Sequence, residues 1–236
     1  MSAALDRRTR WVAGSAVALA LLFAGAATVA SARGGGAAPA PRTPTAESAD
    51  AGFARDMAVH HQQAVEMSFL VRDVTRDEDV RRLAYDIANT QANQRGMLLG
   101  WLDLWELPKT APDGQGPMAW MADDGAHSGH GVEGMQDVQG MQGMEGMDHD
   151  GALMPGMATR AELGRLRDAR GEKAEILFLQ LMTDHHEGGV AMARGCASRC
   201  TVPAEKRLAE GMVVAQRSEL DLMADMLAAR GASPRP

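Results

Sequence analysis

One short pattern of histidines and methionines occurs twice in this chain, and that duplication is the strongest constraint on its fold. The stretch DMAVHHQQAVEM occupies residues 56–67, and LMTDHHEGGVAM occupies residues 181–192. The two halves align at a fixed offset of 125 residues. The aligned pairs are Met57 with Met182, His60 with His185, His61 with His186, Met67 with Met192, Gln91 with Gln216, Gln94 with Glu219 and Leu102 with Leu227. A tandem repeat of this kind indicates a duplicated supersecondary unit.

The first half has the hydrophobic spacing of two helices. Apolar side chains from Phe53 to Val71 recur every third or fourth residue, which places them on one helical face. A second helical pattern runs over about 77–107 and should stop at Pro108, because proline cannot continue a helix. The first half is therefore predicted to form a helical hairpin.

The second half repeats the hairpin after a short additional helix. Thr159 and Glu162 have the spacing of a capping box, and we expect Gly171 to end the helix that they begin. Two longer helices are expected at about 172–194 and 204–230. Two amphipathic hairpins bury their apolar faces best against each other, which predicts an all-α four-helix bundle with one long crossover.

The N-terminus has the pattern of an export signal. Residues 1–10 are basic, residues 11–32 carry no charge, and small side chains occupy Ala30, Ser31 and Ala32. A secretory signal peptide is therefore expected at 1–32. An uncleaved membrane anchor formed by residues 11–32 is the alternative, since the apolar run is long enough to cross a bilayer. In either case the rest of the chain would lie outside the cytoplasm.

The predicted organisation follows from these patterns and from two segments that lack them. Residues 33–49 are rich in Gly, Ala and Pro and should form a disordered linker, and residues 117–157 should form a mobile loop without a core. We expect a signal or anchor at 1–32, a linker at 33–49, a first hairpin at 50–107, a Met/His/Gly-rich loop at 108–156 and a second hairpin at 157–231, with 50–231 as one bundle domain.

The charge balance argues against a nucleic-acid partner. Without residues 1–32 the chain has 21 basic and 30 acidic residues, a net charge of −9. A protein of this charge lacks the basic surface that neutralises phosphates. The membrane is expected to be a partner only through an uncleaved N-terminal segment.

No catalytic motif is present, so we do not expect an enzyme. A di-iron enzyme in a helical bundle requires Glu-x-x-His pairs, and the chain contains none. Glu66, Glu187 and Glu219 are the only acids expected near the histidines, too few for a carboxylate cage. Peptidase and hydrolase motifs such as His-Glu-x-x-His and Gly-x-Ser-x-Gly are also absent.

The repeated histidines and methionines predict a metal site. At 100° per residue, the four side chains of one copy fall within an arc of about 120° and can enter one space between helices. Imidazole and thioether ligands favour copper, Cu(I) above all, with Cu(II) as the second candidate. For a single copy, an ordinary core with histidines bonded to Asp56 and Asp184 would be the better interpretation; two copies in register favour metal. The predicted ligands are Met57, His60, His61, Met67, Met182, His185, His186 and Met192.

The loop between the hairpins has its own candidate ligands. Residues 118–157 contain eight methionines but no isoleucine or phenylalanine. A segment selected only for hydrophobic packing would not use methionine so exclusively. A flexible chain can wrap thioethers around Cu(I). The alternative is an oxidation-prone or partner-binding loop. The secondary ligands are Met118, Met121, His127, His130, Met135, Met141, Met144, Met147, His149, Met154 and Met157.

Two cysteines lie four residues apart, at Cys196 and Cys200. An oxidising compartment permits a disulfide between them, and the geometry requires the second cysteine to lie in a loop that ends a helix before Pro203. Two free thiols or a soft metal pair are the alternatives.

These motifs resemble a known family. FARDMAVHHQQAVEM and ELGRLRDARGEKAEILFLQLMTDHHEGGVAMA look like the two signature segments of the bacterial domain-of-unknown-function family 305, and the likeness covers about 50–107 and 157–230. The resemblance implies an exported, ferritin-like four-helix bundle, with some members linked to copper binding and tolerance. It also implies a role for the eight predicted bundle ligands, whereas the Met-rich loop is not a requirement of the family.

Together these features predict an exported copper-binding protein that serves copper sequestration, transfer or tolerance in the cell envelope. A copper ion is the expected partner, and another envelope copper protein is the candidate protein partner. A metal-free envelope interaction module is the alternative, and a ferritin-like di-metal enzyme is the weaker one.

Overall fold

The computed structural model describes residues 43–122 and 151–236, and within them the regular structure is helical. The expected signal or anchor, most of the expected linker, and loop residues 123–150 lie outside the described residues. Within the described ranges, no helix is both long enough and apolar enough to span a membrane. The helices are α2 (Ala49–Val74), α3 (Glu78–Leu104), the 3₁₀ turn η1 (Ala119–Met121), α4 (Arg160–Asp168), α5 (Glu172–Arg199) and α6 (Pro203–Ala228).

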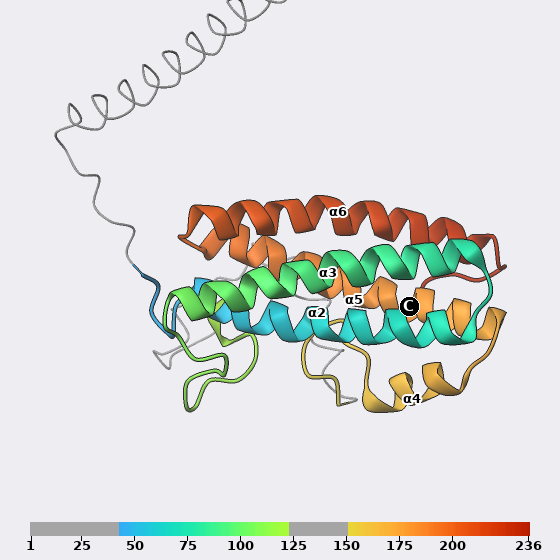
Figure 1. Cartoon of the computed structure of the whole chain (residues 1–236), viewed down its shortest axis with the longest axis horizontal. Helices are drawn as coiled ribbons and strands as arrows, with labels where there is room; N and C mark the ends of the chain where they lie inside the picture. The colour runs from blue at the N-terminus through green and yellow to red at the C-terminus, as the bar shows by residue number, and fades with distance from the viewer. Residues whose placement is uncertain (1–42, 123–150) are drawn as a thin grey trace, which may run out of the picture. The chain divides into compact units, whose positions relative to one another are not determined.

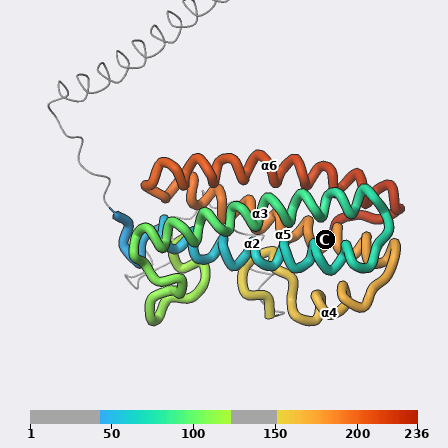
Figure 2. Tube along the Cα trace, in the orientation of Figure 1, coloured from blue at the N-terminus to red at the C-terminus, as the bar shows by residue number. Residues whose placement is uncertain are grey.

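The four long helices form two hairpins that pack on each other (Figure 1). Helix α2 pairs with α3, α5 pairs with α6, and the two hairpins meet where α2 packs against α5. The short helix α4 lies outside the bundle beside α2, as the chain trace in Figure 2 shows. The predicted all-α bundle of two hairpins with a long crossover is confirmed.

Side chains cap the helices where the sequence places small polar residues. Ser48 accepts a hydrogen bond from the Ala51 amide at 3.2 Å and begins α2. The predicted capping box between Thr159 and Glu162 is present at the start of α4. These contacts satisfy amide groups that the first helical turn leaves without partners.

Two helix boundaries differ from those expected. Helix α5 continues past residue 194 to Arg199, because no proline interrupts it before Pro203. Gly171 does not end α4, which stops at Asp168; with φ 53° it instead begins α5. Glycine suits this position because its backbone enters the left-handed region without a Cβ clash.

The apolar core is divided into two clusters. The Met57 cluster contains Phe53, Met57, Leu98, Leu102, Met154, Met192, Cys196, Cys200 and Met212, among others. The Met67 cluster contains Met67, Val71, Leu83, Ile87, Phe178, Met182, Met223 and Leu227, among others. Between the two along α2 and α5 lie the duplicated histidines. The bundle therefore has a polar layer between two apolar ends.

The expectation that residues 117–157 form a mobile loop throughout is wrong at both ends of that segment. Met154 is 1% exposed and belongs to the Met57 cluster. At the other end Asp56 accepts hydrogen bonds from the Met118 amide at 2.7 Å and from the Trp120 indole at 2.9 Å. These contacts pack both ends on the bundle, a feature that the loop composition does not encode.

Candidate metal centre

Four imidazoles meet at the middle of the bundle, two from α2 and two from α5. His60, His61, His185 and His186 are all fully buried. The rings of His60 and His185 have centroids 3.8 Å apart, whereas neighbours on one helix are 6.2 Å and 6.5 Å apart. His60 and His185 occupy equivalent positions in the two hairpins, so their contact joins the hairpins at matching points.

In three of these histidines, a hydrogen bond at Nε2 determines which ring nitrogen carries the proton. His61 Nε2 is 2.8 Å from the Gln94 amide oxygen, and His186 Nε2 is 2.7 Å from the Glu219 carboxylate. His185 Nε2 is 2.9 Å from the His60 carbonyl oxygen. All three partners are acceptors, so each Nε2 carries the proton and each Nδ1 keeps its lone pair.

The same layer contains an unusual number of buried polar atoms without partners. The Nδ1 atoms of His61, His185 and His186 have none, and neither nitrogen of His60 has a well-aligned one, although the ring interacts with the Pro155 carbonyl. The side-chain amides of Gln91 and Gln216 are also buried and unpartnered. Each such group costs about 1–3 kcal/mol of stability unless something binds it. This set of atoms therefore favours a ligand that accepts lone pairs.

Burial keeps the imidazoles of His60, His61 and His185 neutral. Burial, followed by the charge of His61, lowers the pKa of His60 to about 3. Burial also lowers the pKa of His61 to about 4 and that of His185 well below its ordinary value. A neutral imidazole is the form that binds a metal ion, so no proton has to leave these rings at neutral pH.

The four predicted methionines lie on both sides of the histidines. Met57 of α2 and Met192 of α5 belong to one apolar cluster, and Met67 and Met182 belong to the other. All four are fully buried. Each end of the polar layer therefore has one thioether from each hairpin.

The imidazoles alone do not form a three-ligand site. Among the described residues, no three histidines bring ring nitrogens within 4.8 Å of one another. A site for one metal ion in this layer would need further donors. Methionine sulfurs could supply them, or a rotation of the imidazole rings could bring more ring nitrogens together. Mixed imidazole and thioether donors suit Cu(I).

A covering segment, residues 154–158, closes the layer beside α5. The Gln63 side chain holds Ala158 by two hydrogen bonds, donating to its carbonyl at 2.8 Å and accepting from its amide at 2.7 Å. Gly188 permits close approach, since a Cβ there would lie 2.2 Å from the Pro155 carbonyl oxygen. Gly156 has φ 77° and lies against the Asp184 carbonyl.

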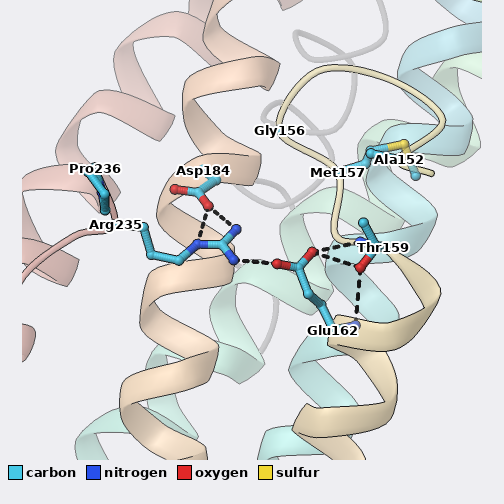
Figure 3. A pocket seen from close by; sticks show the side chains of 8 residues that line it. All are labelled: Ala152, Gly156, Met157, Thr159, Glu162, Asp184, Arg235 and Pro236. Carbon is cyan, nitrogen blue, oxygen red and sulfur yellow. Dashed lines mark hydrogen bonds and ion pairs between the residues drawn. The ribbon is translucent and has the colours of Figure 1, made fainter. Parts of the chain in front are cut away.

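The covering segment leads into a polar pocket at the surface (Figure 3). Arg235 from the C-terminal tail forms ion pairs with Asp184 of α5 and Glu162 of α4. Met157 and Thr159 line the same pocket. The tail thus ties α4 to α5 beside the covering segment.

The alternative in which Asp56 and Asp184 bond the histidines does not describe this site. Asp184 pairs with Arg235, and Asp56 accepts from the Met118 amide and the Trp120 indole. Among the acids expected nearby, Glu66 pairs with Arg167 and Glu187 is exposed. Glu219 is the acid that contacts a histidine, so the described residues form no carboxylate cage.

The predicted loop ligands divide into two groups. Met121 and Met154 are buried, and Met118 and Met157 are partly buried against the Met57 cluster. These four contribute to packing at the bundle surface, and a role in metal binding stays a prediction. The other seven lie outside the described residues: His127, His130, Met135, Met141, Met144, Met147 and His149.

Buried glutamines also belong to the polar layer, and the His and Met spacing did not predict them. Gln91 and Gln216 are 2% and 3% exposed, and Gln216 approaches so closely that a Cβ on Gly189 would lie 2.5 Å from its Oε1 atom. Gln94 and Glu219 orient histidines. The repeat carried this signal, because these polar residues recur at the 125-residue offset on otherwise apolar helical faces.

The chain folds as an all-α bundle of two hairpins with a buried layer of histidines between two apolar clusters. Residues 50–227 match the profile described as "Domain of unknown function (DUF305)", and the chain belongs to this family. No curated protein matches the chain.

Several solved structures are similar to this chain, including those of two DUF305 proteins and of CopM. A DUF305 protein of Streptomyces coelicolor, described as a candidate secreted protein, is 57% identical with a TM-score of 0.66, over 81% of this chain and 99% of that chain. A DUF305 fragment of Deinococcus radiodurans is 27% identical with a TM-score of 0.56, over 80% and 99%. CopM in its Cu(I)-bound form is 18% identical with a TM-score of 0.52, over 76% and 96%, a likeness of fold.

Proposed function

We propose that this protein binds Cu(I) outside the cytoplasm and serves copper sequestration, transfer or tolerance in the cell envelope. The observation that carries this proposal is the set of three buried imidazoles that donate through Nε2 and leave Nδ1 unpartnered. A purely structural histidine would use both nitrogens or avoid burial, because an unpartnered buried polar atom destabilises the fold.

The donor chemistry favours copper over the other common ions. Ca(II) and Mg(II) need several oxygen ligands, and the layer offers one carboxylate, which is already bonded to His186. Thioether sulfur lies at both ends of the layer. Soft sulfur with imidazole selects Cu(I), and Cu(II) is the second candidate.

The relatives support the same proposal. CopM, which shares this fold, has been solved in Cu(I)-bound and Cu(II)-bound forms. The Streptomyces coelicolor relative, described as a candidate secreted protein, agrees with the export signal read at residues 1–32. Another envelope copper protein is the partner we propose for transfer.

Competition with a Cu(I) chelator tests the proposal. The metal-free protein should take Cu(I) from the chelator and should ignore Mg(II) and Ca(II). Replacing His60 and His61, or His185 and His186, by Ala should weaken binding at the bundle, because half of the donors are removed. Gln62→Ala and Glu187→Ala are matched controls, since both residues are exposed beside a histidine pair. Failure of the wild-type protein to compete for Cu(I) would exclude the proposed function.

A further inference from the structure

A second cluster of metal-ligating atoms lies at the turn between α5 and α6, within the Met57 cluster. The Sγ atoms of Cys196 and Cys200 and a carboxylate oxygen of Glu205 lie within 4.8 Å of one another. Cys196 is in the last turn of α5, Cys200 follows that helix, and Glu205 is in the first turn of α6. The two cysteines are joined by a disulfide in this structure.

The burial of Glu205 is not explained by helix capping. Its side chain is 0% exposed, and the Asp50 carboxylate, which can accept a hydrogen bond only from a protonated Glu205, is the polar side chain that interacts with it. Capping of the turn is done by Asp50, which accepts from the amides of Thr201 at 2.8 Å and Val202 at 2.7 Å. Two buried carboxyl groups side by side destabilise the fold, and a cation bound by Glu205 would relieve that repulsion.

We propose that reduction of the Cys196–Cys200 disulfide creates a Zn(II) site formed by both thiolates and the Glu205 carboxylate. Zn(II) accepts sulfur and carboxylate oxygen in one tetrahedral site, with the fourth position open here. Cu(I) would need only the two thiolates, so participation of the Glu205 carboxylate is what distinguishes a Zn(II) site from a Cu(I) site. This site does not depend on copper binding by the histidine layer.

The redox step requires a dithiol reductant, either a small dithiol or an exported dithiol protein. The reductant supplies two electrons and two protons, the S–S bond breaks, two thiols form, and the reductant becomes a disulfide. Both thiols and the protonated Glu205 carboxyl group release their protons as Zn(II) binds. Reoxidation to the disulfide would expel the ion, so occupancy would report the redox state of this turn.

Zn(II) and Co(II) titrations of the reduced and oxidised full chain test the proposal. The protein is reduced with a dithiol, desalted without oxygen and titrated in both states; the histidines are common to both, so the difference isolates the cysteine site. Reduced protein should bind one more Zn(II) than oxidised protein, and Co(II) should give thiolate charge-transfer absorption. Equal stoichiometry in the two states would overturn the proposal.

Two variants identify the ligands. Cys196→Ser with Cys200→Ser should abolish the difference between the two states. Glu205→Gln should keep two titratable thiols but lose on the order of 10–100-fold in Zn(II) affinity. Unchanged affinity of Glu205→Gln would overturn the assignment of Glu205.

Reduction of the disulfide also lowers the stability of the fold, so the melting temperature of the reduced protein is measured with and without Zn(II). Only the folded turn brings Glu205 to the two cysteines, so Zn(II) should raise the melting temperature of the reduced wild type. The rise should be smaller in Glu205→Gln and absent in the double serine variant. A reduced wild-type protein whose melting ignores Zn(II) would contradict the site.

Discussion

His60 and His185 contact each other across the two hairpins, with ring centroids 3.8 Å apart and the His185 Nε2–H group donating to the His60 carbonyl. The pair is equivalent in the repeat, but the two rings are not equally satisfied. His185 Nε2 makes a well-aligned hydrogen bond, whereas the ring of His60 has only the Pro155 carbonyl near it. His60 is therefore the most informative position for separating a metal ligand from an ordinary core residue.

His60→Leu should stabilise the metal-free protein and weaken Cu(I) binding. The substitution removes two buried nitrogens that lack a well-aligned hydrogen bond and gives up only the interaction with the Pro155 carbonyl, so the free energy of unfolding should rise by on the order of 1 kcal/mol. Urea unfolding and chelator competition measure the two effects. Gln62→Leu, on the exposed face of the same helix, is the control. A variant destabilised by several kcal/mol would show that His60 is a packing residue.

Deletion of residues 123–150 should leave the bundle intact and lower its copper capacity. The deletion removes Met135, Met141, Met144 and Met147 but keeps both packed ends of the loop. A shorter crossover changes loop-closure entropy only slightly, so helicity and melting should barely change. Deleting residues 118–154 instead should lower the melting temperature, because Met121 and Met154 are buried. Unchanged copper stoichiometry after the shorter deletion would show that the loop is not a copper store.

The fold was predictable because the hydrophobic period, the proline and the capping residues all pointed to the same helices. Phe53, Met57 and Val71 were placed on one face by spacing alone, and all are fully buried. The burial of Met154 was not predictable, because an isolated apolar residue in a Gly-rich segment is not part of a periodic pattern that would indicate its position. The contact of His60 with His185 was not predictable either. These residues are 125 positions apart, and sequence spacing gives no distances between helices.

Metal-free protein should lose stability as the pH falls from about 6.5 toward 4. His60, His61 and His185 have pKa values lowered by burial, so below pH 6.5 the unfolded chain binds more protons than the folded one. Each histidine can contribute up to about 1.4 kcal/mol per pH unit until its folded pKa is reached. Urea midpoints measured across this range check the prediction, and His60→Leu should show a shallower slope. A flat profile would contradict neutral burial of these rings.

Glu205 should act in the opposite direction at higher pH. Burial, followed by the charge of Asp50, raises the pKa of Glu205 to about 9, so its contribution to stability is lost as the pH rises from about 4.5 to 9. Glu205→Gln cannot ionise and should become progressively more stable than the wild type over that range. Thermal melting of the oxidised proteins measures the difference, and a difference that does not grow with pH would argue against a buried neutral carboxyl group.

The partners of His61 and His186 should orient these rings for the metal. Glu219→Leu removes the acceptor that holds the His186 Nε2 proton and should cost on the order of 10–100-fold in Cu(I) affinity. Glu219→Gln recreates the arrangement of His61 with Gln94 and should keep most of the affinity. Chelator competition compares the two variants, and equal losses would mean that charge, rather than the hydrogen bond, is what Glu219 supplies.

Copper exchange should depend on the covering segment, and Gly188 is the position that tests it. A Cβ on residue 188 would lie 2.2 Å from the Pro155 carbonyl oxygen, a backbone atom that cannot rotate away, so Gly188→Ala should displace residues 154–158 from α5. Gly96→Ala is the matched control, because a Cβ there meets nothing within 4 Å and alanine favours an exposed helix by about 1 kcal/mol. Gly188→Ala should melt below the wild type and Gly96→Ala above it. Bound Cu(I) should pass to a chelator faster from Gly188→Ala than from Gly96→Ala or the wild type, because the covering segment would no longer close the histidine layer. If Gly188→Ala melts lower yet releases copper at the wild-type rate, the segment stabilises the bundle without controlling access, and the metal must enter by another route.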